Sequence, residues 1–149
     1  MEICALVFPV RGESIFLVLR TSGRGAGFYG GYGGRMEPED GGNIVKTATR
    51  RFYEESGARP MSIEKVAVVR LFEAGRVFCE RHIFFSRSWR GELSGEAIKF
   101  SLPRPPYEKM MPGDREWFSL IVSGQKFRAS LHYVQGKKDV ERFSVDGPL

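Results

Sequence analysis

One stretch of the chain decides how the rest is interpreted: residues 33–58, which read GGRMEPEDGGNIVKTATRRFYEESGA. Four apolar residues recur in it at helical spacing and share one face: Ile44, Val45, Ala48 and Phe52. Asn43 is a good N-cap, Gly57 stands where a C′ glycine ends a helix, and Pro60 prevents continuation. We therefore predict a helix over residues 44–56.

The last turn of this helix carries two adjacent carboxylates, Glu54 and Glu55. The helix dipole opposes negative charge at a C-terminus by about 0.3–1 kcal/mol per charge. A bound cation would compensate, because carboxylate oxygens and a nearby backbone carbonyl suit Mg²⁺ or Mn²⁺. The alternative is a solvated acidic face on which Arg50 and Arg51 supply ion pairs along the helix.

Residues 22–34 are too rich in glycine for a helix and too rich in aromatic residues for a plain linker. A surface loop whose backbone approaches a ligand closely would have this composition. A flexible low-complexity loop is the alternative.

The remaining segments alternate between strands and one further helix. Strands are predicted over 3–8, 15–19, 65–72, 77–86 and 98–102, and a hairpin over 126–134 and 139–145. A second helix begins at Asp114, which can cap it, and ends at Gly124, with a buried face made of Trp117, Leu120 and Ile121. This order predicts a mixed sheet with helices packed on it, in a single domain over residues 1–149.

Composition favours a globular protein with an anionic ligand. The 149 residues are 42% hydrophobic and 28% charged, and 23 basic against 18 acidic residues give a net charge of +5. No basic block points to a stable nucleic-acid complex. Cys4 and Cys79 have no framework spacing, and no stretch approaches a signal peptide or a membrane span. We expect a soluble, cytoplasmic monomer with reduced thiols.

The opening stretch resembles the Nudix box, G-x5-E-x7-R-E-U-x-E-E-x-G-U, in which U is a bulky apolar residue. The matching residues are Gly34, Arg50, Phe52, Glu54, Glu55, Gly57 and Ala58. Two residues are inserted before Arg50, which we assign to Gly41-Gly42, so that Asp40 replaces the first glutamate of the box. Arg51 replaces the glutamate that follows the arginine.

Nearly the whole chain is similar to the animal-type MutT homologues that hydrolyse oxidised purine nucleoside triphosphates such as 8-oxo-dGTP. The similarity lies in residues 25–34 and 110–118, in Lys126-Phe127 and in Gln135-Gly136. It implies the Nudix α/β/α sandwich, an α/β (α+β) fold with a mixed sheet between helices. It also implies a metal site on the box helix and a purine pocket beside the Met-x-Pro segment.

The resemblance assigns roles to particular residues. Glu54 and Glu55 would bind the metal, with the Gly33 carbonyl nearby, and Asp40 or Glu96 could compensate for the glutamate missing at Arg51. Glu96 is the candidate for a further metal ligand or the catalytic base, and a solvated loop glutamate is the alternative. The predicted substrate-binding residues are Arg20, Phe28, Tyr29, Gly30, Met111 and Asp114.

At three positions the chain lacks a residue that these relatives have in the pocket for the purine base. Gly30 stands where the relatives have an asparagine, Met111 where they have a tryptophan, and Gly113 where they have the first of two aspartates. Asp114 then remains as the evident reader of the base edge, with a simple N-cap as its other possible role.

The reaction implied is attack by water on a phosphorus of a nucleoside triphosphate, releasing nucleoside monophosphate and pyrophosphate with Mg²⁺ or Mn²⁺. The partner would be this small nucleotide alone, with no membrane. The alternative is a Nudix-fold module that binds a nucleotide without cleaving it, because Arg51 could fill the position of the metal. A third reading is another Nudix substrate, such as a dinucleotide or ADP-ribose.

Overall fold

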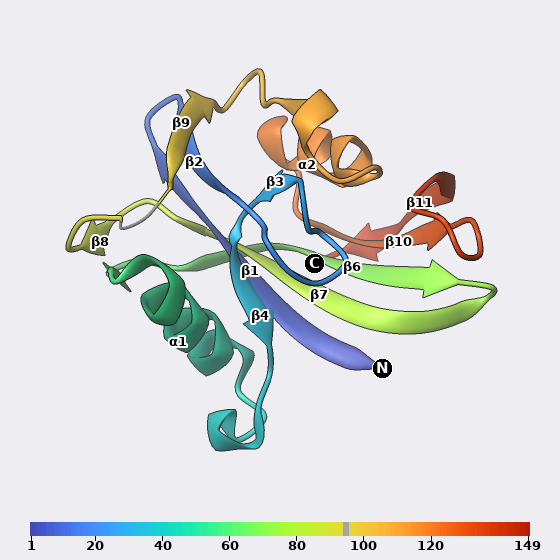
Figure 1. The fold of residues 1–149 in the computed structure, drawn as a ribbon, viewed down its shortest axis with the longest axis horizontal. Helices are drawn as coiled ribbons and strands as arrows, with labels where there is room; N and C mark the ends of the chain where they lie inside the picture. Colours follow the sequence, from blue (N-terminus) through green and yellow to red (C-terminus); the bar gives the residue numbers. More distant parts are fainter. Residues whose placement is uncertain (94–95) are drawn as a thin grey trace.

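The computed structural model describes residues 1–93 and 96–149, and its centre is a mixed sheet (Figure 1). The longer strands are β1 (Glu2–Arg11), β2 (Ser14–Leu19), β6 (Glu64–Glu73), β7 (Arg76–Ser86), β10 (Phe127–Tyr133) and β11 (Val140–Pro148). The shorter strands are β3 (Tyr29–Gly30), β4 (Tyr32–Arg35), β5 (Arg59–Pro60), β8 (Trp89–Arg90) and β9 (Ile98–Ser101). The helices are α1 (Ile44–Ser56), α2 (Asp114–Val122) and two 3-10 turns, η1 (Pro38–Asp40) and η2 (Tyr107–Lys109).

The strand order is β11-β10-β6-β7-β1-β2-β3, with β4 paired to β1 and β9 paired to β2. The pairs β1–β7 and β6–β10 are parallel, and the other pairs in this sheet are antiparallel. Strands β5 and β8 form a separate small ribbon. The predicted mixed sheet is therefore confirmed, and β1 lies near its centre.

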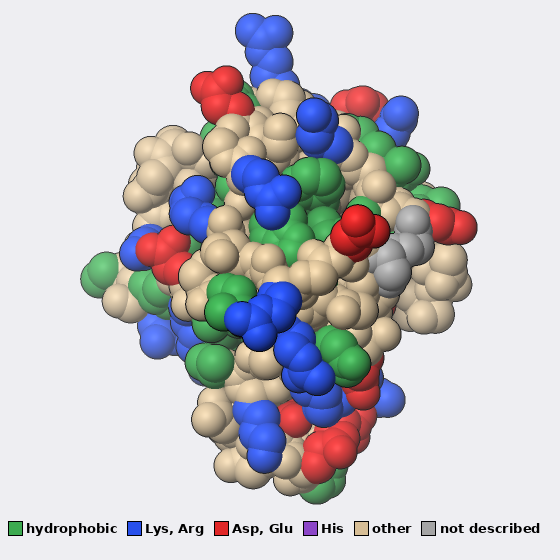
Figure 2. Space-filling model, turned by 90° about the vertical axis from the view of Figure 1, so that its left-hand side faces the viewer, with side chains coloured by type: hydrophobic (Ala, Val, Ile, Leu, Met, Phe, Trp, Pro, Cys, Tyr) green, Lys and Arg blue, Asp and Glu red, His purple; other side chains and the backbone are tan. Residues whose placement is uncertain are grey.

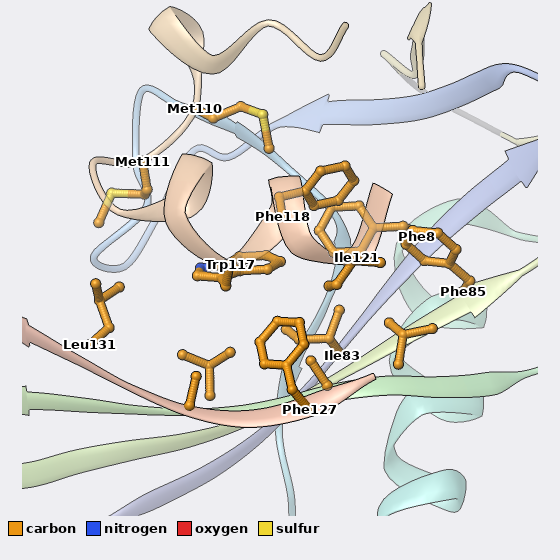
Figure 3. Close-up of a cluster of buried hydrophobic side chains, with 14 of the residues drawn as sticks. Phe8, Ile83, Phe85, Met110, Met111, Trp117, Phe118, Ile121, Phe127 and Leu131 are labelled. Carbon is orange, nitrogen blue, oxygen red and sulfur yellow. The ribbon is translucent and has the colours of Figure 1, made fainter. Parts of the chain in front are cut away.

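Two hydrophobic cores cover the two faces of this sheet. On one face, Phe8 packs against α2, where its ring centroid lies 5.2 Å from that of Phe118 (Figure 3). On the other face, Ala5 and Val7 pack with Phe52 of α1. Side chains that alternate along β1 thus enter different cores, which explains why this strand is apolar on both faces.

The helix predicted over residues 44–56 is confirmed and forms α1. The Asn43 side chain accepts hydrogen bonds from the backbone N–H groups of the first turn, and Gly57 ends the helix at φ 77°. The predicted apolar face was wrong at one position, because Val45 is 43% exposed and Thr47 is buried instead. Burial of Thr47 is possible because its hydroxyl donates a hydrogen bond to Asp40 at 2.8 Å.

The glycine-rich segment is only partly a loop. Its second half forms β3 and β4, and β4 pairs with β1 so that Gly33 lies opposite Leu6. A Cβ atom at Gly33 would overlap the backbone carbonyl of Ala5. Glycine is required there because two backbones approach closely.

Helix α2 begins at Asp114, but this residue does not cap it. The N-cap position belongs to Gly113, at φ 98°, and no side-chain cap is formed. The buried face consists of Trp117, Phe118 and Ile121, whereas Leu120 is only partly buried (Figure 3). Within residues 1–93 and 96–149, neither helix is long and apolar enough to cross a membrane.

Candidate active site

The end of α1, the end of β2 and the start of β4 meet around one carboxylate. Glu55 Oε1 accepts a hydrogen bond of 2.6 Å from the Gly33 backbone N–H. Arg20 Nη1 donates to both oxygens of Glu55, at 3.0 and 2.8 Å, and Arg20 Nη2 lies 3.5 Å from the Gly33 carbonyl oxygen. The fold thus brings together three predicted site residues from separate parts of the sequence: Arg20, Gly33 and Glu55.

Arg51 lies beside the neighbouring carboxylate, Glu54, to which Arg50 Nη1 also donates a hydrogen bond of 3.1 Å. The guanidinium of Arg51 donates to the Arg35 carbonyl oxygen at 3.0 and 3.1 Å and to Glu37 Oε1 at 3.1 Å. It also lies 3.5 Å from Glu54 Oε1. A Cβ atom at Gly34 would lie 2.8 Å from Arg51 Nε, so the glycine makes room for the guanidinium. Both carboxylates at the helix end are therefore paired with an arginine.

Asp40 does not fit the metal-binding role expected for it. It is 1% exposed and accepts hydrogen bonds from Arg50 at 2.7 and 2.8 Å, from Thr47 and from the Glu37 backbone N–H. The Arg50 hydrogen bonds hold the pKa of this carboxyl far below its usual range. The inserted pair Gly41-Gly42 follows with φ of 60° and 75° and makes the turn into α1. Asp40 is a buried anchor for this turn.

The oxygen donors at the helix end fit one kind of metal site. The side chains of Glu54 and Glu55 are 48% and 32% exposed. Arg20 contacts both Glu55 and the Gly33 carbonyl oxygen, so these oxygen donors lie close together. No group of three or more acidic, histidine or cysteine side chains suited to a metal occurs in the described part of the chain. Mg²⁺ is commonly held by one or two carboxylates and the phosphates of a ligand. The residues present therefore fit a metal ion that is shared with a ligand. Arg20 and Arg51 would compete with this ion for the two carboxylates.

Glu96 lies close enough to this carboxylate to share a cavity with it. A pocket of about 310 Å³ is lined by Arg20, Tyr32, Glu55 and Glu96. Glu96 is exposed and belongs to the segment just before β9. The segment therefore brings a further acidic group to the rim of the candidate site.

A second pocket lies beside the first and takes up about 240 Å³. All six predicted substrate-binding residues line it: Arg20, Phe28, Tyr29, Gly30, Met111 and Asp114. Pockets for whole drug-sized ligands usually measure about 300–1,000 Å³. This volume therefore suits one heterocyclic base, and Arg20 lines both pockets.

Asp114 supplies a buried polar group to the base-sized pocket. It is 5% exposed, and its Oδ1 atom has no hydrogen-bond partner in residues 1–93 and 96–149. Burial raises the pKa of this carboxyl to about 7, against the opposing charge of Arg81. Buried polar atoms nearly always have a partner, so this one is available to a ligand.

Sequence reasoning missed three cationic residues of this pocket: Arg24, Arg35 and Arg81. Arg81 follows Cys79 by two positions on β7, so strand alternation could have placed it on the inner face. Arg24 lies over the rings of Phe78 and Tyr133, at 4.7 and 4.5 Å from their centroids. Nothing in the glycine-rich segment around Arg24 predicts those contacts.

Two curated animal proteins are similar to this chain, although no family model matches it. An oxidized purine nucleoside triphosphate hydrolase from Danio rerio is 26% identical over 131 residues, which are 85% of this chain and 83% of that protein. The protein of the same name from Mus musculus is 28% identical over 127 residues, 82% and 80% of the two chains.

Solved structures show the same architecture. A mutator MutT protein from Bacillus halodurans has a TM-score of 0.82 at 19% identity, with 98% of each chain covered. A MutT Nudix hydrolase from Burkholderia pseudomallei has a TM-score of 0.63 at 20% identity, covering 70% of this chain and 86% of that one. The mixed sheet with its two helices is therefore the Nudix fold, as predicted.

The chain therefore has the Nudix fold, and its sequence is related to those of the oxidized purine nucleoside triphosphate hydrolases.

Proposed function

We propose that the protein is a Nudix-type pyrophosphohydrolase that cleaves a purine nucleoside triphosphate, including oxidised forms, to the monophosphate and pyrophosphate. The observation that supports this most directly is the position of Arg20. It lines the base-sized pocket together with Asp114 and also lines the pocket that contains Glu55. A nucleotide bound with its base in the first pocket would extend its phosphates past Arg20 toward the carboxylates.

The base pocket would hold the purine by packing and by one polar contact. Tyr29 and Met111 offer apolar surface on its walls, and Asp114 offers the carboxyl whose Oδ1 atom lacks a partner among the described residues. A carboxyl with a pKa of about 7 is part protonated near neutral pH, so it can donate to a ring carbonyl or accept from an N–H group.

The phosphates would be bound by the arginine and the acidic helix end. Glu54, Glu55 and the Gly33 carbonyl are the groups that would hold Mg²⁺ or Mn²⁺, which supplies neutralisation of phosphate charge when bound. Glu96 is the base we assign: its carboxylate takes a proton from the water whose oxygen attacks phosphorus. Pyrophosphate departs as the phosphorus–oxygen bond breaks.

Arg20 would change partners when the nucleotide binds. Its ion pair with Glu55 spans 2.8 Å, but the two side chains are 24% and 32% exposed. Ion pairs with such exposure contribute about 0–1 kcal/mol, so the exchange costs little. Transfer of the guanidinium to the phosphates would leave the Glu55 oxygens available to the metal.

Release of pyrophosphate from a panel of nucleoside triphosphates, with and without Mg²⁺, tests this proposal. We predict metal-dependent release that Glu55→Gln abolishes, because the amide cannot replace a charged ligand. Glu39→Gln is the matched control, since Glu39 is 66% exposed and, among the described residues, pairs only with Arg50, at 3.8 Å. Equal thermal unfolding of the two variants would show that the fold is intact. If Glu55→Gln retains most of the rate, the metal assignment is wrong.

A second candidate is a module that binds nucleotides without cleaving them. Arg51 beside Glu54 and Arg20 on Glu55 favour it, because two fixed cations already neutralise the helix end. In that case nucleotides would raise the unfolding temperature without Mg²⁺, and no nucleotide of the panel would yield pyrophosphate.

A further inference from the structure

Arg81 occupies an unusual position for a charged residue. It lies in the middle of β7, on the face that also carries the buried residues Cys79 and Ile83. Its neighbours across the sheet are Cys4 on β1 and Val69 on β6, and its side chain lines the base-sized pocket. Arg81 thus lines a pocket to which the aromatic residues Phe28, Tyr29 and Phe78 also contribute.

The guanidinium of Arg81 has no protein partner in residues 1–93 and 96–149. No hydrogen bond joins it to another residue there, and no carboxylate oxygen lies within 4.0 Å of its nitrogens. The charge of Arg81 acts to lower the pKa of Asp114, although the two side chains form no ion pair within 4.0 Å. The Arg81 nitrogens are not among the buried atoms without a partner, so solvent reaches them and they can donate to a ligand in the pocket.

The rest of the pocket also offers more donors than acceptors. Arg24 Nε is buried and has no hydrogen-bond partner within the described ranges. The carboxylates that line the pocket are Glu2, which is already paired with Arg35 at 3.3 Å, and Asp114. A ligand edge rich in acceptors therefore complements this pocket better than an edge rich in donors.

We propose that Arg81 determines the base specificity of this pocket and selects purines that present ring oxo groups, of the xanthine type, over purines that present an amino group, of the adenine type. This inference rests on the proposed function, because it concerns the same nucleotide site. Guanidinium N–H groups donate to carbonyl oxygens and to a deprotonated ring nitrogen, both of which xanthine offers. An amino group directed at Arg81 would place donor against donor and leave both unpaired.

Calorimetric titration with xanthosine, inosine and adenosine monophosphates tests the inference. A hydrogen bond to a charged group contributes about 1.5–3 kcal/mol, so wild-type protein should bind the xanthosine nucleotide at least about tenfold more tightly than the adenosine nucleotide. Arg81→Met should remove this preference while keeping a side chain of similar length. Arg128→Met is the matched control and should retain it, since Arg128 is an exposed residue of β10 outside the pocket.

Arg81→Lys covers the case in which the methionine variant fails to fold. It keeps the charge but loses the planar pair of donors, so the preference should fall without disappearing. Equal binding of the three nucleotides by wild-type protein, no binding of any of them, or an unchanged preference in the folded Arg81 variants would each overturn the inference.

Monophosphates contain no phosphate chain to cleave, so this measurement is independent of catalysis. A preference without pyrophosphate release from triphosphates would support the base selection and contradict the proposed function. Pyrophosphate release without a preference would support the proposed function and contradict the base selection.

Discussion

Arg51 stands where the Nudix box has a glutamate, and the structure shows what its guanidinium does there. It binds the Arg35 carbonyl, which ends β4, and lies between Glu37 and Glu54. The side chain therefore connects β4 to α1 and adds a positive charge beside the proposed metal ligands. Any metal that binds Glu54 must do so in competition with this charge.

We predict that Arg51→Glu tightens Mn²⁺ binding and raises kcat/KM, because it replaces the competing cation with a third carboxylate. Loss of the hydrogen bonds to Arg35 should lower the free energy of unfolding by about 1 kcal/mol. Arg51→Gln is the control that removes the charge without adding a ligand. A large loss of turnover in Arg51→Glu would instead show that Arg51 binds the phosphates.

Asp114 makes stability depend on pH, because its pKa is raised to about 7 in the folded protein. The proton is held more tightly in the folded state, so the carboxyl favours folding below the unfolded pKa of about 4 and loses this contribution as pH rises to about 7. We predict that Asp114→Asn raises the unfolding temperature relative to wild type more at pH 8 than at pH 5. One pKa unit corresponds to about 1.4 kcal/mol, so the difference should amount to a few kcal/mol.

A substitution at exposed Asp139 serves as the control, with the same thermal measurement at both pH values. If Asp114→Asn shifts the unfolding temperature equally at pH 5 and pH 8, the carboxyl is not desolvated as described.

Among the elements, β4 links the fold to the site. It pairs with β1 through Gly33 and Gly34, and the Gly33 N–H also binds Glu55 of α1. The strand is short and glycine-rich because a neighbouring backbone and the Arg51 guanidinium lie where side chains would otherwise be. The position of the acidic helix end relative to the base pocket therefore depends on β4.

We predict that Gly33→Ala destabilises the protein by about 3 kcal/mol or more, because the added methyl group overlaps the Ala5 carbonyl. Gly30→Ala is the matched control in the same segment. Its Cβ atom would meet only Arg20 Cγ, at 3.8 Å, so a change of less than about 0.5 kcal/mol is expected. Denaturant unfolding measures both, and equal stability of the two variants would contradict the close approach of β4 to β1.

For the whole molecule, the net charge of +5 bears on how an anionic ligand arrives. Lys and Arg side chains are spread over the face shown in Figure 2, around a hydrophobic hollow. We predict that kcat/KM for a nucleoside triphosphate falls as ionic strength rises toward physiological values, where the Debye length is about 8 Å. Binding of an uncharged nucleoside is the control and should not change. A salt-independent kcat/KM would show that steering plays no part.

Local interactions explain why much of the fold was predictable from the sequence alone. Helix α1 extends over the predicted residues because Asn43 and Gly57 cap it through contacts within a few residues. The long strands were predicted from their apolar runs. The pair Glu54-Glu55 was recognised because adjacent carboxylates at a helix end oppose the dipole whatever the rest of the chain does.

Other properties depend on contacts between segments that are distant in the sequence. Pairing with β1 and β2 turned half of the glycine-rich segment into strands, and burial against Arg50 made Asp40 an anchor instead of a metal ligand. Packing of α2 on the sheet desolvates Asp114, and the arrangement of β7 directs Arg81 into the pocket. The sequence by itself thus determined the helices, the long strands and the acidic end of α1. The tertiary structure alone decided which polar groups are paired and which line the pockets, because desolvation and partner distance exist only once the chain is packed.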